Sequence, residues 1–250
     1  MVAIGLGFLL LATTGCASVS APWRYVAEPI EGRVIDKETR QPIEGVVVVA
    51  QWILLEPFQG HHREHWVVIE TVTDAEGRYQ IPGWGPKWRP WFRWLGSADP
   101  VLDIFKPGYW LERRSNASYA SGGLLGTEPN PIGAKVRKSF WSGKKIELYP
   151  FRIGKEVRKQ LEPERSELYP PNYVVTEEDW ANQVNGVQSE VAWGGQLENS
   201  TAEEWLKIKN LVLIVEKECS NLPSNLRQKL RRVPEEYKSI LFGDKKETCL

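Results

Sequence analysis

The chain has 250 residues, of which 42% are hydrophobic, so it is long and apolar enough for one or two ordinary domains and is not a disordered protein. Thirty-two basic residues balance thirty-two acidic ones, which predicts no nucleic-acid partner and leaves any electrostatic partner to a local patch. Twelve tryptophans stand against one methionine and three histidines, so few residues are available for metal or acid–base chemistry.

The first segment, Val2 to Ala12, is an apolar run that is too short to cross a bilayer, which needs roughly twenty residues. It predicts the hydrophobic region of an export signal. Residues 12–16, Ala-Thr-Thr-Gly-Cys, resemble a bacterial lipobox, which implies a lipoprotein signal over residues 1–16 and acyl chains such as palmitate on Cys16. Ser18 stands where aspartate would resemble an inner-membrane retention signal, so we expect the periplasmic face of the outer membrane. An ordinary export signal with a chance cysteine is the alternative.

Residues 17–29 are expected to form a tether, and strand-like segments follow it. The expected strands are Gly32–Ile35, Val46–Trp52, Trp66–Thr73 and Arg78–Ile81. The first two flank a polar turn closed by Pro42 and predict a β-hairpin, while the last two flank a turn whose Gly77 can take a positive φ. Short strands separated by turns predict a β-sandwich.

The order of these segments resembles the carboxypeptidase regulatory-like domain, a transthyretin-like sandwich. The family pattern joins a G-x-V-x-D strand, a T-x-x-P-I-x-G turn and a T-D-x-x-G-x-Y/F segment. The matching residues are Gly32, Val34, Asp36, Thr39, Pro42, Ile43, Gly45, Thr73, Asp74, Gly77 and Tyr79, with residues 105–109 on a later strand and turn. The resemblance implies a seven-stranded antiparallel β-sandwich over residues 30–150. It also implies an accessory or adhesive module without catalytic residues of its own.

The three histidines, His61, His62 and His65, all lie in the connection expected over residues 53–65. Spacings of three and four residues would place imidazoles on one side of a helical turn, as a metal site needs. A loop between two strands offers no such helix, so a solvated loop is the expectation and a metal site is the alternative.

Residues 83–96 contain Trp84, Trp88, Trp91 and Trp94 among several cations and prolines. The prolines prevent a continuous helix, so we expect an irregular insertion in the sandwich. Three interpretations remain: a lid packed on the protein, an interfacial loop in the headgroup layer, or a platform that stacks sugar rings. We favour the lid, because four exposed indoles would form an unusually large apolar patch.

The closing strands of the sandwich are expected at Val101–Lys106, Lys135–Phe140 and Lys144–Pro150, with a long loop over residues 113–134. After Pro150 the composition shifts toward Glu, Lys, Arg and Leu, which predicts a helical region over residues 151–250. The expected helices are Gly154–Glu162, Thr176–Val184, one from Ser200 or Thr201 through Cys219, Asn225–Arg231 and Glu235–Phe242.

Cys219 and Cys249 are the only cysteines besides Cys16. An exported chain with one lipidated cysteine and two others predicts a disulfide between those two. The bridge would close the C-terminal helices.

No nucleophile elbow, Walker loop, dinucleotide turn, HExxH or CxxC motif occurs in the sequence. We therefore predict a non-enzymatic envelope protein without a cofactor, attached to the membrane by its lipid and binding a protein or glycan partner. The alternative is a small metal-binding protein or metal-dependent hydrolase that uses His61, His62 and His65.

Overall fold

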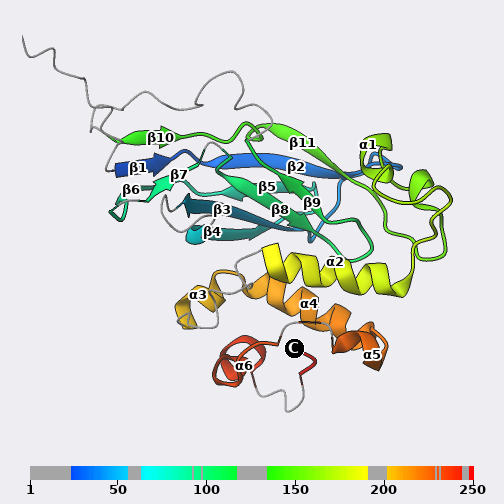
Figure 1. The fold of residues 1–250 in the computed structure, drawn as a ribbon. Coiled ribbons are helices and arrows are strands. Elements are labelled where there is room, and N and C mark those ends of the chain that lie inside the picture. The colour runs from blue at the N-terminus through cyan, green and yellow to red at the C-terminus, as the bar shows by residue number, and fades with distance from the viewer. Residues whose placement is uncertain are drawn as a thin grey trace, which may run out of the picture.

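A computed structural model describes residues 24–55, 63–91, 93–96, 98–116, 134–190, 202–228, 230, 232–243 and 248–250. It combines β-strands with C-terminal helices, and the strands β1 to β11 form three small sheets (Figure 1). Cys16, His61 and His62 lie outside the described residues. None of the helices in the described ranges has the length and apolar character needed to cross a membrane.

The largest sheet is antiparallel and has β3 at its centre. Its strands are β4 (Arg63–Val72), β3 (Val47–Leu55), β8 (Val101–Phe105) and β9 (Glu112–Arg114), and β7 (Trp94–Leu95) pairs with the end of β3. Both faces of β3 are buried along almost its whole length. This explains why its sequence is a continuous apolar run and does not alternate.

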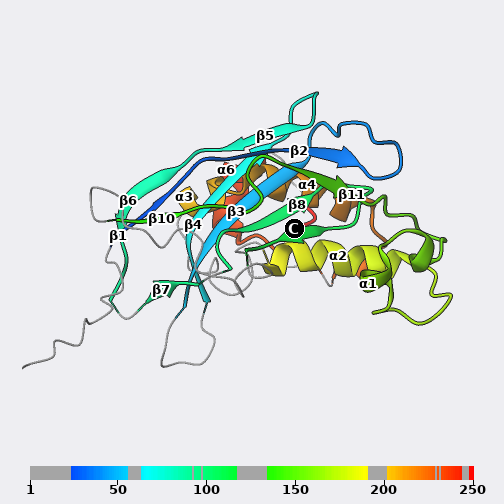
Figure 2. The same cartoon turned by 90° about the horizontal axis from the view of Figure 1, so that it is seen from above.

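The other two sheets have three strands each (Figure 2). One contains β11 (Lys144–Leu148), β2 (Ile30–Asp36) and β5 (Arg78–Ile81). The other contains β10 (Lys135–Arg137), β1 (Arg24–Ala27) and β6 (Trp84–Trp88). In each sheet one pair is parallel, β2 with β11 and β1 with β10, because the late strands join edges that the early strands leave open.

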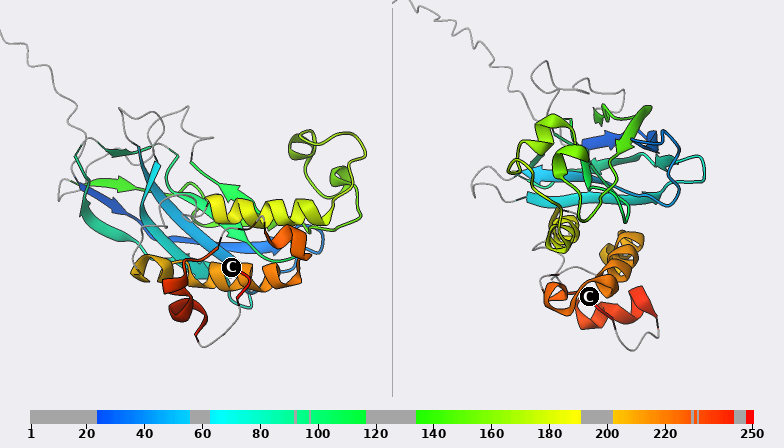
Figure 3. Two further views of the ribbon diagram at one scale, coloured as in Figure 1. Left: turned by 60° about the horizontal axis from the view of Figure 1, so that its bottom comes forward. Right: turned by 90° about the vertical axis from the view of Figure 1, so that its right-hand side faces the viewer.

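One apolar core lies between the large sheet and the two small sheets (Figure 3). Its fully buried members include Ile30, Val34, Trp52, Leu54, Ile81, Leu102, Ile104, Ile146 and Leu148. These residues come from the large sheet and the β11–β2–β5 sheet, and Tyr25 and Ala27 of β1 join the core from the third sheet. All three sheets therefore depend on one core for their stability.

The predicted single seven-stranded antiparallel sandwich is not the observed arrangement, since the strands are divided among three sheets and two pairings are parallel. The predicted hairpin is also wrong, because β2 and β3 belong to different sheets. Thr73 holds the crossing between them: its hydroxyl accepts a hydrogen bond from the Val46 amide at 2.9 Å and donates one to the Ile43 carbonyl at 2.7 Å. Residues 24–27, expected within the tether, form β1.

Two glycines of the family pattern have steric reasons in this structure. Gly77 has a φ of 70°, as the turn prediction requires, and a Cβ there would lie 2.4 Å from the Val34 carbonyl oxygen. At Gly32 a Cβ would lie 2.5 Å from the hydroxyl of Tyr79, whose ring covers this position. Glycine is therefore needed at both positions because β2 lies very close to β5 and to the turn that precedes β5.

The longest helices, α2 (Glu177–Glu190) and α4 (Lys209–Asn221), lie against the outer face of the large sheet (Figure 1). The shorter ones are α1 (Pro163–Ser166), α3 (Ala202–Leu206), α5 (Ser224–Arg227) and α6 (Glu235–Phe242). The helix expected over Gly154–Glu162 is only a 3₁₀ turn at Val157–Lys159.

Helix α2 begins at the predicted capping box. The Asp179 amide donates to the Thr176 hydroxyl at 3.2 Å, and the Thr176 amide donates to the Asp179 carboxylate at 2.7 Å. The helix predicted to run through Cys219 is instead divided into α3 and α4. Glu70 of β4 accepts the amide hydrogens of Asn210 and Leu211, which a continuous helix would use internally.

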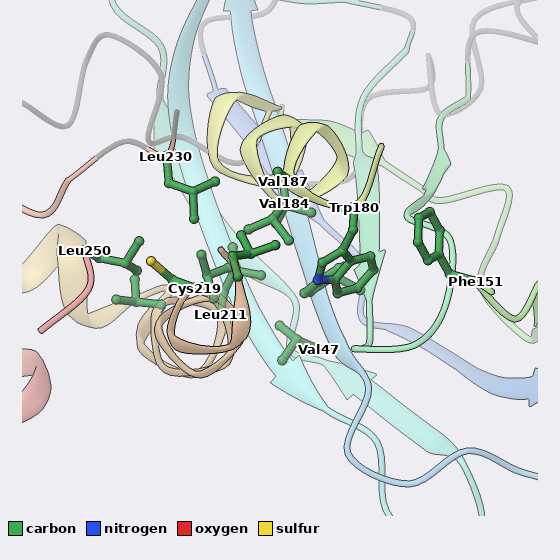
Figure 4. Packing of buried hydrophobic residues seen from close by; sticks show 14 of the residues in the cluster. Val47, Phe151, Trp180, Val184, Val187, Leu211, Cys219, Leu230 and Leu250 are labelled. Atoms are coloured by element: carbon green, nitrogen blue, oxygen red, sulfur yellow. The ribbon is translucent and has the colours of Figure 1, made fainter. Parts of the chain in front are cut away.

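A second apolar core joins the helices to the outer face of β3 and β8 (Figure 4). Val47 of β3, Trp180 of α2 and Leu211 of α4 point into the same space. The predicted disulfide is confirmed: Cys219 of α4 is bonded to Cys249, with 5.9 Å between their Cα atoms. The bridge ties the last residues of the chain to the helix that packs on the sheet.

Candidate functional site

The outer face of the β11–β2–β5 sheet lies on the side opposite the helices (Figure 1). Its strands alternate between buried and exposed residues, as β5 shows with Arg78 and Gln80 exposed and Tyr79 and Ile81 buried. Such alternation is typical of a sheet with one solvated face. In the described part of the chain, this face is therefore one sheet surface on which a ligand can lie.

Three cations stand side by side across this face. Lys145 of β11 is paired with Arg33 of β2, and Arg33 is paired with Arg78 of β5. Like charges directly opposite each other on adjacent strands are destabilising. None of the three forms an ion pair with a described residue, and Arg33 donates instead to the Glu76 carbonyl at 2.7 Å. We call Lys145, Arg33 and Arg78 the cation row.

The cation row lies in an open groove of about 680 Å³, which also reaches β4 and the turn after it. Glu31, Thr71 and Gln80 add neutral and anionic hydrogen-bonding groups to its lining. Asp74 lines it too, but its carboxylate already accepts the amide hydrogens of Glu76 and Arg78 at 3.0 and 2.7 Å. Most residues that line the groove are therefore charged or polar, and the cation row is among them.

Aromatic rings lie next to another groove residue, Lys144. Its ammonium nitrogen is 3.3 Å from the ring centroid of Phe140 and 5.9 Å from that of Trp141. Both rings are half-buried, and the Trp141 indole donates to the Ser115 carbonyl at 3.0 Å. The Gly143 amide donates to the Glu31 carbonyl at 2.7 Å, which holds this turn against β2. The Lys144 ammonium therefore covers one face of the Phe140 ring in a cation–π contact, and neither ring is part of the groove lining.

Two buried aspartates have perturbed pKa values, and neither lines the groove. Burial would raise the pKa of Asp36, but amide hydrogens of Thr39 and Glu38 and the Tyr109 hydroxyl bind its carboxylate and lower the pKa. Asp103 lies on the outer face of β8, and burial raises its pKa to about 6 although Arg113 is only 3.0 Å away. The hydrogen bonds of the Asp36 carboxylate stabilise a turn, and this structural role explains its lowered pKa without a catalytic one.

The tryptophans of residues 83–96 have different surroundings. Trp84 is half-buried and packs edge-on against Trp52 and Trp66, with ring centroids 5.4 and 5.3 Å apart. Trp88 and Trp91 are 65% and 71% exposed. The lid prediction therefore holds for Trp84 and is wrong for Trp88 and Trp91, while the Trp94 side chain lies outside the described part.

The segment is also more regular than expected, because residues 84–88 form β6 and residues 94–95 form β7. Strand β6 pairs with β1, which lies within the segment expected to be the tether. An edge strand tolerates Pro86, since an amide that faces away from the sheet is not needed for pairing.

His65 belongs to β4, where it is paired with Ile53 and is half-buried. The expected loop position is wrong because β3 and β4 continue past an irregularity at Trp52 and pair as far as Leu55 and Arg63. Within the described ranges, no group of three or more His, Cys, Asp or Glu side chains is placed to hold a metal ion.

The cation row was not found from the sequence. The alternation of Arg33 and Arg78 with apolar residues indicates that they are exposed, but it does not show that they are neighbours. The parallel pairing of β2 with β11 brings Lys145 beside them from more than a hundred positions away. Sequence patterns of single strands do not specify such a pairing.

No protein-family model matches the chain, and no curated protein sequence matches it. Among solved structures, the chain has 15% identity and a TM-score of 0.25 with a 9R-lipoxygenase from Cyanothece, covering 88% of this chain and 29% of that one. It has 14% identity and a TM-score of 0.24 with 3-chlorocatechol 1,2-dioxygenase from Rhodococcus opacus, covering 52% of this chain and 62% of that one. The chain thus spans less than two thirds of either protein, and TM-scores this low support no conclusion about fold or function.

Proposed function

We propose that the chain is a non-enzymatic lipoprotein of the bacterial cell envelope, on the periplasmic face of the outer membrane, whose open sheet binds an acidic glycan. The lipobox-like residues ending at Cys16 support the anchor and the location. The bridge between Cys219 and Cys249 is consistent with an oxidising compartment. The resemblance to carboxypeptidase regulatory-like domains supports an accessory module in a transthyretin-like arrangement, rather than an enzyme.

The observation that carries the binding proposal is the cation row, Lys145, Arg33 and Arg78, in the open groove. Adjacent strands lie about 4.8 Å apart, so the row extends over about 10 Å, the scale of a disaccharide. Carboxylate or sulfate groups on neighbouring sugars would relieve the repulsion within the row. Binding would then be favoured by the new ion pairs and also by the reduced repulsion among the three cations.

A glycan fits the groove better than a folded protein does. Protein interfaces depend on a central cluster of buried aromatic or apolar anchors, whereas half of the residues that line this groove are charged. Gln80 and Thr71 of the lining add groups that can hydrogen-bond sugar hydroxyls next to the cation row.

The proposal is tested by titrating the full-length chain in detergent with acidic oligosaccharides and with neutral ones of equal length. Arg33→Gln with Lys145→Gln should weaken acidic binding at least about tenfold, since hydrogen bonds to charged groups contribute roughly 1.5–3 kcal/mol each. The control is Lys155→Gln with Arg158→Gln, two exposed cations outside the groove. Equal affinity for acidic and neutral sugars, or an unchanged affinity in the groove variant, would refute the proposed binding.

The anchor is tested separately by Cys16→Ser, which should release the protein from the membrane fraction because diacylation is needed for stable attachment. Unchanged membrane association would contradict the lipoprotein assignment.

The metal-dependent alternative rests on His61, His62 and His65, of which the structure places only His65. Stoichiometric zinc or copper in protein purified without a tag, lost after replacement of the three histidines, would favour that alternative.

A further inference from the structure

One end of the molecule exposes large apolar side chains. Trp88, the last residue of β6, is 65% exposed, and Trp91, in the turn that follows, is 71% exposed. Leu206, at the end of α3, is 45% exposed. Helix α3 lies toward the same end as β6 in both Figure 1 and Figure 2.

Cations surround these apolar side chains. The guanidinium carbon of Arg24 is 4.9 Å from the ring centroid of Trp88. Lys87 donates to the Trp66 carbonyl at 3.2 Å, and its ammonium lies 5.0 Å from the Trp66 ring centroid. Lys207 follows Leu206 and is close enough to Lys87 that burial and the charge of Lys207 together lower the pKa of Lys87. Neither lysine forms an ion pair with a described residue. We call Lys87, Trp88, Trp91, Leu206 and Lys207 the contact end.

The contact end lies where the described chain begins. Arg24, the first residue of β1, is paired with Trp88. Cys16 is eight positions earlier in the sequence, and eight extended residues span at most about 28 Å. If Cys16 carries the lipid, as the proposed function holds, this end must therefore lie near the bilayer surface.

We infer that the contact end is a membrane-binding surface that lies on an anionic bilayer. Tryptophan is enriched at the headgroup level, where its ring is amphipathic, and basic side chains near an anionic surface contribute about 1 kcal/mol each. A surface of phosphate headgroups would neutralise Arg24, Lys87 and Lys207 together while the exposed indoles insert among the headgroups. The anchor and the contact end together would fix the orientation of the molecule on the membrane, because two separate points of attachment restrict its rotation more than one does.

The test uses full-length chain with Cys16→Ser, so that no acyl group contributes. Binding is measured by sedimentation with vesicles of phosphatidylcholine alone and with vesicles that also contain phosphatidylglycerol. Trp88→Ala with Trp91→Ala should lower binding to the mixed vesicles at low and high salt. Lys87→Gln with Lys207→Gln should lower it roughly 25-fold at low salt only, about fivefold for each lysine.

The apolar run Val2–Ala12 is present in every variant, so the comparison among variants isolates the contact end. Leu168→Ala, at a side chain 83% exposed in the turn after α1, is the apolar control. Quenching of tryptophan fluorescence by lipids brominated on the acyl chain gives a second readout. The parent should be quenched and the double tryptophan variant much less.

Equal vesicle binding and equal quenching in parent and variants would overturn the inference. Loss of oligosaccharide binding in the tryptophan variant with unchanged vesicle binding would also overturn it, in favour of a sugar-stacking platform. These outcomes are independent of the anchor, which Cys16→Ser tests by membrane release.

Discussion

The two outward sheet faces of this molecule differ although the sheets share one core. The outer face of the large sheet carries Val47, Val49 and Phe105, and helices α2 and α4 cover it. The outer face of β11–β2–β5 carries Lys145, Arg33 and Arg78 and stays open as a groove. The difference teaches that the covered face contributes stability, whereas the open face keeps an electrostatically unfavourable arrangement that a ligand can relieve.

The largest effect is expected for an aromatic residue of the helices that cover the large sheet. Trp180→Ala should lower the free energy of unfolding by about 3–5 kcal/mol, since the ring packs 6.0 Å from Phe105 and 4.9 Å from Phe151, measured between centroids. Gln80→Ala on the open face should change it by less than about 0.5 kcal/mol. Chemical denaturation of both variants measures the contrast, and a small effect of Trp180→Ala would show that the cover is loosely packed.

Removing the disulfide should destabilise the helical cover next. Cys219→Ser with Cys249→Ser opens a loop that spans thirty positions, which corresponds to about 3–4 kcal/mol on the chain-entropy estimate. Hydrogen exchange should increase in α4 and α6 before it increases in β2 and β5. If both thiols of the untreated protein react with an alkylating reagent, the premise fails.

Asp103, on the covered face, should make the free energy of unfolding depend on pH. Burial raises its pKa to about 6, so the unfolded chain loses this proton at a lower pH than the folded chain does. Stability should therefore fall as the pH rises from about 4 to 6, by an amount on the order of 3 kcal/mol, and then stay level. Denaturation of parent and Asp103→Asn across this range measures the difference, and parallel profiles would contradict the assignment.

Glu70 connects the large sheet to the start of α4. Its carboxylate accepts the Leu211 amide at 2.7 Å and the Asn210 amide at 2.9 Å. Glu70→Ala should lower the free energy of unfolding by about 1–3 kcal/mol, because these amides lose their partner beside the covered face. Glu31→Ala, on the open face, is the matched control and should have little effect. Equal effects of the two variants would argue that Glu70 does not act as a cap.

The smallest effect is expected in the cation row, with the opposite sign. Lys145→Gln removes one like-charge contact with Arg33, so it should raise the free energy of unfolding by about 0.2–1 kcal/mol at low salt. The gain should disappear at high salt, which screens exposed charges. A loss of stability would show that Lys145 already has a favourable partner and would weaken the proposed glycan site.

Several elements could be predicted because their signals are local. The turn ending at Gly77, the Thr176–Asp179 cap and helix α6 each depend on residues within a few positions. The apolar, β-branched run over residues 46–52 likewise identified the strand β3. The disulfide followed from a count of the cysteines.

The sequence by itself thus determined the positions of several strands, helices and turns, because spacing, β-branching and caps act over short distances. It did not identify β1 or β6 as strands. Only the tertiary structure decided that β2 avoids β3, that β6 pairs with β1 and that Lys145 joins Arg33 and Arg78. It also decided that Trp84 is covered and Trp88 is not. Strand pairing depends on which edges and apolar faces remain unburied in the whole chain, and no single segment carries that information.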